Sequence, residues 1–271
     1  MKAQRAETMD ALQLQQRQNT WLSPLTRRGW AWEFLRRSSA YRVGFAQHGT
    51  ADADAASWGL LRYENPTLDA REAAVFWRAD DCPSVLRLTA LRGSEHVAQV
   101  PFNLDHITCR MAFHHSDSGD RSDVLFAEAG RFLQVSISGT EDIRGAVLFM
   151  PALEPPQNVT ARAASFRRLN DLMQHGHLRQ ALYPQEPRAP RLINVLKALD
   201  GSLAGLPHRE VAMLLFSKER VEMDWGGRQH HLRDQVRRAI SYGHGLMDGG
   251  YRQFLRPTYS RQIARPGAPH A

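Results

Sequence analysis

Residues 190–255 constrain the fold of this chain most, because three short helical patterns follow one another there. The first helix is expected over 192–203 and the second over 207–216, where Pro207 suits the first helical position. The third is expected over 228–242 and is amphipathic, since its apolar residues recur at helical spacing. They are Leu232, Val236, Ala239, Ile240 and Gly243. Together the segments have the outline of a helix-turn-helix unit.

The polar side of the expected third helix carries arginines. Arg233 and Arg237 lie off the apolar stripe, one turn apart. In a helix-turn-helix unit the recognition helix enters the major groove, where Arg and Gln read base edges while other cations contact phosphates. We therefore expect DNA contacts from eight residues in this region. They are His208, Arg209, Arg228, Gln229, His230, Arg233, Arg237 and Arg238.

The same pattern also fits an ordinary three-helix packing domain with a solvated basic face. Asp234 stands four residues before Arg238, a spacing that allows an ion pair on one helix face. The segment 217–227 is expected to be a turn, longer than the minimal helix-turn-helix allows. The formal net charge of +7 suits a polyanionic partner, which favours DNA without deciding the matter.

The rest of the chain changes period near residue 155, from two to 3.6. Before that point, short β-prone runs alternate with turn signals and predict a small antiparallel sheet or barrel-like domain. These runs lie at 74–77, 85–88, 97–100, 124–126, 132–137 and 146–150. After it, a helix is expected over 161–174, with three apolar residues on its inner face. They are Phe166, Leu169 and Met173.

Two further helical segments are expected to bury apolar side chains. Near the N-terminus a short helix over 28–37 carries aromatic residues that seat it on a neighbour, and Ser38-Ser39 ends it. In the first helix of the C-terminal unit, five residues form a core stripe before Gly205 stops the helix. They are Leu192, Val195, Leu196, Leu199 and Leu203.

Motifs that carry chemistry are missing from the sequence. There is no Walker loop, GxSxG elbow or HExxH motif, and the carboxylates form no pair that can be assigned to one face. The two cysteines, Cys82 and Cys109, exclude a disulfide scaffold and a cysteine zinc finger. Adjacent histidines, as at His114-His115, point to different faces, and no cluster completes a metal site. We therefore expect no enzyme, catalytic residue, cofactor or metal.

The sequence also predicts where the protein works. No stretch approaches the roughly 18 apolar residues that span a bilayer, so no membrane partner is expected. The polar, Gln-rich residues 1–19 do not resemble a secretory signal. We expect a cytoplasmic protein.

Four strings together resemble proteobacterial excision-activator proteins of integrative and conjugative elements. They are Ala31–Arg37 followed by Tyr41-Arg42, His208–Phe216, Leu232–Arg238, and Gly245–Arg252. The resemblance covers about residues 21–256. It implies a regulator-like N-terminal domain, a helix-turn-helix-like C-terminal domain, and activation of excision genes. Short relatives in that family are antiactivators that bind proteins.

Two departures from the family pattern affect helix ends. Pro207 stands where a small hydroxyl residue usually caps the helix, which changes how the helix is entered. Ser38-Ser39 replaces an Asn-Pro-like pair, so the first helix is expected to end differently. Neither departure touches the arginines, and the family's residue-level DNA contacts are not carried over.

The expected fold class is α+β, with a small helical N-terminal segment, a β-rich middle domain and an all-α helix-turn-helix-like C-terminal domain. The expected parts are a flexible leader, a helical regulator-like domain, a small β-rich domain, a helix-turn-helix-like DNA-binding domain and a flexible tail. Their boundaries are 1–20, 21–73, 74–153, 158–256 and 257–271, respectively.

The expected function is a DNA-binding transcriptional regulator that activates excision or transfer genes of a mobile genetic element. Double-stranded DNA is the expected partner, with RNA polymerase or an antiactivator protein as further partners. The alternative is a protein-binding adaptor or antiactivator that keeps the helix-turn-helix shape without binding DNA. Arginines that form ion pairs with carboxylates of the same chain would favour that alternative. The operator, the promoter, activation versus repression, the oligomeric state and the role of the β domain stay open.

Overall fold

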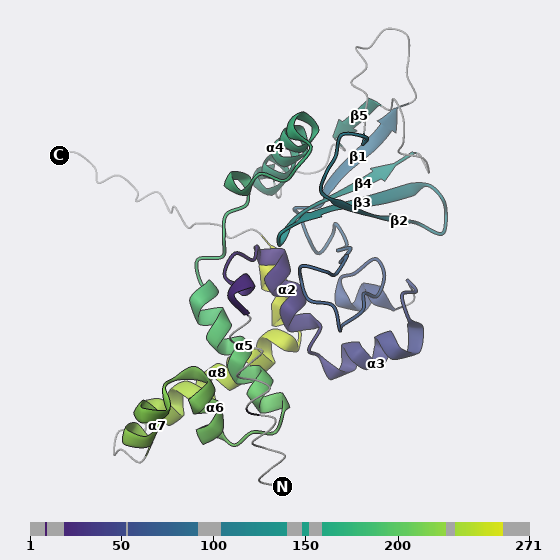
Figure 1. Cartoon of the computed structure of the whole chain (residues 1–271). Helices are drawn as coiled ribbons and strands as arrows, with labels where there is room; N and C mark the ends of the chain where they lie inside the picture. Colours follow the sequence, from purple (N-terminus) through teal and green to yellow (C-terminus); the bar gives the residue numbers. More distant parts are fainter. Residues whose placement is uncertain are drawn as a thin grey trace, which may run out of the picture.

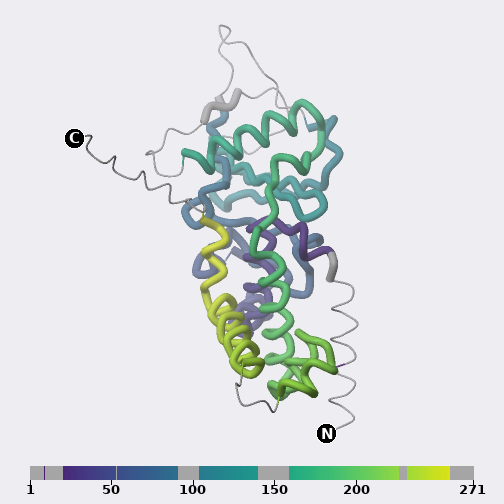
Figure 2. The backbone as a smooth tube through the Cα atoms, turned by 90° about the vertical axis from the view of Figure 1, so that its left-hand side faces the viewer, coloured from purple at the N-terminus to yellow at the C-terminus, as the bar shows by residue number. Residues whose placement is uncertain are grey.

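The computed structural model confirms the expected α+β class (Figure 1). It describes Met9 and residues 19–52, 54–91, 104–139, 148–151, 159–225 and 231–256. A five-stranded sheet and helix α4 form one end of the molecule, α6 and α7 lie at the other, and α2 lies between them. Figure 2 shows the same order from the side, with α5 and α8 running side by side.

Helices α2 and α3 dominate the N-terminal part, whose elements are η1 (Asn19–Leu22), α2 (Arg27–Leu35), α3 (Ser39–His48) and η2 (Ala55–Trp58). Helix α2 corresponds to the expected aromatic helix, and Trp30, Trp32 and Phe34 are fully buried. Ser38 has a further role: its side chain accepts a hydrogen bond from the Tyr41 amide and caps α3.

The sheet is mixed, which corrects the prediction of a purely antiparallel one. Its strands are β1 (Leu86–Leu91), β2 (Arg110–His115), β3 (Arg121–Glu128), β4 (Arg131–Ser138) and β5 (Leu148–Pro151). They follow the order β2-β3-β4-β1-β5, with β1 parallel to β4 and the other pairs antiparallel. Strand β2 was not predicted, because its sequence mixes polar and apolar residues. The predicted strand at 97–100 lies outside the described residues.

The predicted strand at 74–77 was wrong. Among these residues only Trp77 pairs, in an isolated bridge to Leu60. The Gln134 side chain takes the place of a strand partner: its Oε1 accepts from the Trp77 amide at 3.0 Å, and its Nε2 donates to the Trp77 carbonyl at 2.9 Å. A side-chain amide thus satisfies backbone groups that a ladder would otherwise pair.

Helix α4 (Val159–His175) packs on one face of the sheet and is followed by η3 (Gln180–Leu182). Leu169 and Leu172 from α4 join Leu133, Val135 and Ile137 from β4 in one apolar cluster. Phe166 was expected on this face, but it is 49% exposed. The buried stripe runs through Ser165, Leu169 and Leu172, at spacings of four and three, which turns residue 166 away from the sheet.

The remaining helices are α5 (Ala189–Leu203), α6 (His208–Leu215), α7 (Lys218–Asp224), α8 (His231–Met247) and η4 (Gly250–Phe254). The expected stripe of α5 is buried from Leu192 to Leu199, whereas Leu203 is 48% exposed. This stripe does not pack only within the C-terminal unit. It shares a core with α2, where the Phe34 and Phe254 rings stack with their centroids 6.0 Å apart.

Two features of the C-terminal helices correct the prediction. The segment 217–227 was expected to be a turn but contains α7, which Ser217 caps by accepting from the Arg220 amide. Helix α8 continues to Met247 instead of ending near 242, because Gly243 does not act as a helix stop. A Cβ atom at Gly243 would lie 3.0 Å from the Leu199 Cβ, so this glycine permits close packing of α8 on α5.

Candidate nucleic-acid interface

Helix α8 holds its apolar stripe inward and its arginines outward. Leu232 and Val236 are buried in a cluster with Val211, Leu214 and Val221 from α6 and α7. The three arginines that follow Leu232 are all exposed: Arg233, Arg237 and Arg238. Their placement off the core is the arrangement that a DNA-reading helix requires.

Intramolecular contacts of these arginines are few. The Arg233 guanidinium lies 5.4 Å from the Trp225 ring centroid. Arg237 Nη2 lies 3.1 Å from an Asp234 carboxylate oxygen, while Arg238 Nε donates to the Asp234 backbone carbonyl at 3.2 Å. Asp234 therefore pairs with Arg237 and not, as the spacing suggested, with Arg238. The side chains of Arg237 and Asp234 are 72% and 43% exposed, and such surface pairs contribute only about 0–1 kcal/mol.

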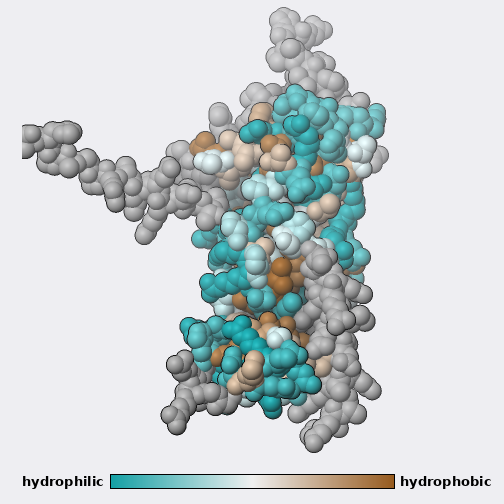
Figure 3. All heavy atoms as spheres, turned by 60° about the vertical axis from the view of Figure 1, so that its left-hand side comes forward, coloured by the Kyte–Doolittle hydropathy of each residue, from teal (hydrophilic) through white to brown (hydrophobic). Residues whose placement is uncertain are grey.

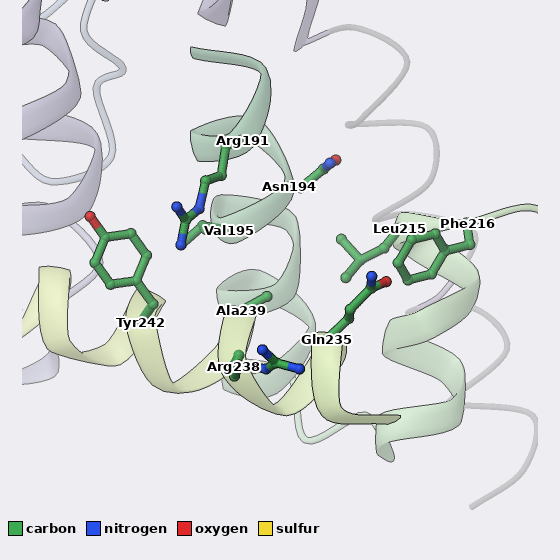
Figure 4. Close-up of a pocket in the computed structure, with 9 residues that line it drawn as sticks. All are labelled: Arg191, Asn194, Val195, Leu215, Phe216, Gln235, Arg238, Ala239 and Tyr242. Atoms are coloured by element: carbon green, nitrogen blue, oxygen red, sulfur yellow. The ribbon is translucent and has the colours of Figure 1, made fainter. Parts of the chain in front are cut away.

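A pocket of about 360 Å³ adjoins this helix face, between α5, α8 and the end of α6 (Figure 4). It brings two guanidinium groups, two side-chain amides and two aromatic rings together. The lining residues are Arg191, Asn194, Val195, Leu215, Phe216, Gln235, Arg238, Ala239 and Tyr242. We call this the α5–α8 groove. None of the described residues that line it is a carboxylate, and the Arg191 guanidinium lies 5.5 Å from the Tyr242 ring centroid.

Of the described groove residues, only Arg238 was predicted from the sequence to be a contact residue. Arg191 and Asn194 stand three residues apart on α5, and Gln235 stands three before Arg238 on α8. These spacings place each pair on one helix face. Each pair could therefore have been recognised in the sequence as a polar helix face. The spacings do not show that α5 and α8 lie side by side.

The other predicted contact residues lie elsewhere. His208 and Arg209 are exposed at the start of α6. Arg238 neighbours Leu215 and Phe216 at the opposite end of α6, about 10 Å away along the helix axis. Arg228, Gln229 and His230 lie outside the described residues.

Helix α7 differs from α8 in charge. It carries Glu219, Glu222 and Asp224 against Lys218 and Arg220. Both cations face carboxylates one turn away, at 3.9 and 3.8 Å. A hydrogen bond from its own backbone amide and one from Ser217 lower the pKa of Glu219. Phosphates would therefore be repelled by α7 and attracted by α8.

A buried ion network joins the N-terminal part to α5. Arg37 Nε and Nη2 donate to the two carboxylate oxygens of Asp200 at 2.6 and 3.0 Å, and Nη1 donates to Glu33 Oε2 at 2.7 Å. Burial opposes the charge of Arg37, but Asp200 and Glu33 more than offset it and raise its pKa. The fold thus fixes α2 to the helix that forms one wall of the groove.

The described residues contain no group of three or more His, Cys, Asp or Glu side chains that could hold a metal ion. No described helix is long and apolar enough to cross a membrane. Seen from the side of α4 to α7, the surface is mostly hydrophilic, with small hydrophobic patches between (Figure 3).

Two segments of the chain match known families of regulatory domains. Residues 150–256 match the family model described as "T6SS, Transcription factor, DNA binding domain". Residues 15–62 match the model described as "Proteobacterial transcriptional regulator-like domain". No curated protein and no solved structure matches the chain. The first match contains every groove residue, and the two matches together indicate that the chain is a transcriptional regulator with a DNA-binding domain in its C-terminal part.

Proposed function

We propose that the chain binds double-stranded DNA through the exposed face of α8 and the adjoining α5–α8 groove. One observation carries the proposal: among the described residues, Asp234 is the only carboxylate that pairs with an α8 arginine, it does so in an exposed pair, and none lines the groove beside them. These residues fall within the segment that matches a DNA-binding domain. A cationic face without acidic groups suits the phosphate backbone, which supplies much of the affinity for DNA.

Individual roles follow from position along α8. Arg233, in the first turn, would read a base, because recognition helices lead with their N-terminal residues. Arg237, one turn later, would contact phosphate. Arg191 and Arg238 would hold phosphates at the groove, where Asn194 and Gln235 add amide donors and acceptors. His208, Arg209, Arg228, Gln229 and His230 remain part of the proposed interface.

The biological role that we propose is activation of excision or transfer genes on a mobile genetic element. The strings at 208–216, 232–238 and 245–252 support it through their resemblance to excision activators. RNA polymerase and an antiactivator protein are the further partners that this role would require. A genome-wide footprint of the full chain tests it: sites at excision genes would support the role, whereas sites at T6SS genes would favour the system named in the description of the matching family.

The DNA-binding proposal is tested by gel shift with footprinted DNA. We expect the wild type to bind and the triple variant Arg233→Ala/Arg237→Ala/Arg238→Ala to lose binding. Arg220→Ala removes one exposed arginine from the acidic helix α7, so it is the matched control for the single variant Arg233→Ala and should leave binding unchanged. Equal loss in these two single variants would mean that net charge, and not the α8 face, governs binding.

A protein-binding adaptor or antiactivator is the second candidate. The pairing of Arg237 with Asp234, and of both α7 cations with carboxylates, favours it, because paired cations have less to offer phosphate. A wild-type chain that is folded but yields no footprint, at any salt concentration, would move this function ahead.

A further inference from the structure

A second pocket lies where the N-terminal helix α2, the sheet, α4 and the residues after α8 meet. Its volume is about 270 Å³. Among the described residues, four arginines and no carboxylate line it: Arg27 and Arg28 from α2, Arg168 from α4, and Arg256. We call it the junction pocket. Its walls come from both segments that match regulator domains and from the sheet between them.

Three polar atoms of its lining residues are buried without a hydrogen-bond partner among the described residues. They are the Nε atoms of Arg27 and Arg28 and the hydroxyl of Tyr183. The other nitrogens of Arg28 are partly satisfied, since Nη2 donates to Gln134 at 2.6 Å. A buried donor without a partner costs free energy that a bound acceptor would recover.

The positive charge of the pocket is only partly compensated, because Arg27 pairs with Glu186 at 2.8 Å. Across the described part of the chain, no carboxylate pairs with Arg28 or Arg168. Arg168 Nε donates to the Leu182 carbonyl at 2.9 Å, and its guanidinium lies 4.6 Å from the Tyr183 ring centroid. Burial lowers the pKa of Arg168, and the nearby charge of Arg28 lowers it further. By contrast, buried Arg37 faces two carboxylates, so the fold elsewhere pairs its buried cations.

Aromatic side chains complete the walls. Phe132, Tyr183 and Phe254 line the pocket beside the guanidinium groups. Ligand pockets usually measure about 300–1,000 Å³ and combine apolar walls with a few polar groups. A volume of about 270 Å³ therefore suits a small molecule with one ring and one charged group.

We propose that the junction pocket binds a small organic anion, a carboxylate or phosphate monoester on a ring-sized apolar body, through Arg28, Arg168 and Tyr183. The anionic group accepts hydrogen bonds from the unpaired donors and neutralises the two arginines. The ring packs against the aromatic walls. Because the walls belong to both regulator-like segments, the bound anion strengthens the contact between them.

The test is a calorimetric titration of the full chain with phenyl phosphate and, separately, benzoate. At least one should bind saturably and raise the melting temperature, and the better of the two identifies the anionic group. Inorganic phosphate carries only the anionic group and phenol only the ring, so both should bind more weakly than phenyl phosphate. No saturable binding of either ring-bearing anion would overturn the proposal. The titration contains no DNA, so its failure leaves the DNA-binding proposal standing.

Two variants locate the site. Arg168→Gln should lower the affinity about ten- to a hundredfold, as expected for a hydrogen bond to a charged group. Arg167→Gln is the matched control, since Arg167 is the exposed neighbour on the same helix and should bind as the wild type does. Equal losses in both variants would show non-specific attraction and overturn the assignment.

Tyr183→Phe keeps the test decisive if Arg168→Gln fails to fold. It removes only a hydroxyl that has no partner to lose, so the melting temperature of the free protein should not fall. Affinity should drop about two- to tenfold, the range for one neutral hydrogen bond. An unchanged affinity in a folded Tyr183→Phe chain would exclude the hydroxyl from the site and contradict the proposed geometry.

Discussion

Arg37 and Arg237 are the same residue type in opposite surroundings. The Arg37 side chain is 6% exposed and is held by the carboxylates of Glu33 and Asp200, which tie α2 to α5. The Arg237 side chain is 72% exposed and makes one surface pair. An arginine's role therefore follows from its burial and its partners: the buried network joins two parts of the chain, and the α8 arginines stay available to a partner.

The largest expected effect concerns the buried member of this comparison. Arg37→Ala should destabilise the fold by about 3–5 kcal/mol, because Asp200 loses the cation that it pairs with and buried Glu33 keeps only its pair with Arg36. Arg237→Ala, the matched exposed change, should cost less than about 1 kcal/mol. Urea denaturation of both variants measures the difference. Similar losses would break the contrast and make Arg237 structural.

Arg233 provides the corresponding prediction for DNA. Arg233→Ala should weaken binding to the specific site by about 1–3 kcal/mol and relax the preference at one base position. Its melting temperature should stay near that of the wild type, because the side chain is exposed and off the core stripe. Competition gel shifts with single-base variants of the site provide the measurement. If Arg233→Ala bound the specific site as tightly as the wild type, α8 would not be the recognition helix.

Two glycines of α8 differ in the space around them. Gly243→Ala should destabilise by about 1–3 kcal/mol, because its Cβ would lie 3.0 Å from the Leu199 Cβ and overpack the contact with α5. Gly245→Ala meets nothing within 4 Å and should instead stabilise, by up to about 1 kcal/mol, through helix propensity. Thermal melting should show opposite signs, and a stabilising Gly243→Ala would mean that α5 and α8 are not closely packed.

His114 gives a smaller, pH-dependent effect. The Asp123 carboxylate, 3.9 Å from Nδ1, raises the pKa of His114 above the usual 6.5, burial opposes this, and the hydrogen bond between Nε2 and Asp52 adds to the increase. A raised pKa means that the protonated imidazolium stabilises the folded state below pH 6.5, and that this contribution is lost as the pH rises through the folded-state pKa.

We therefore expect the wild type to lose stability as the pH rises above the usual imidazole pKa of about 6.5, and His114→Gln to lose less. Urea midpoints across this rise in pH provide the measurement. Parallel pH profiles for the two proteins would exclude His114 as the source.

The smallest expected effect concerns Arg237 and salt. If Arg237 contacts phosphate, Arg237→Ala should weaken binding to all sequences alike and reduce the salt slope by roughly one unit. Binding isotherms at several salt concentrations measure the slope. A slope equal to that of the wild type would mean that the pair with Asp234 persists in the complex.

Local periodicity predicted much of the C-terminal helices. The spacing of Leu192, Val195 and Leu199 predicted their burial on α5, and the stripe through Leu232 and Val236 predicted which face of α8 points inward. Arg233, Arg237 and Arg238 were placed outward for the same reason. Phe166 shows the limit of this reasoning, because an apolar residue on an amphipathic helix is buried only if the neighbour reaches it.

By itself the sequence determined the α+β class, the approximate spans of α4 to α6, and the outward arginines of α8, since these depend on residues three or four apart. Only the tertiary structure decided that β1 runs parallel to β4, that α4 packs on the sheet, and that α2 and α5 share a core. It also decided that Gly243 serves packing and that four arginines meet in one pocket. Such contacts join residues far apart in the chain, and which surfaces meet depends on how the whole apolar area is buried rather than on any local pattern.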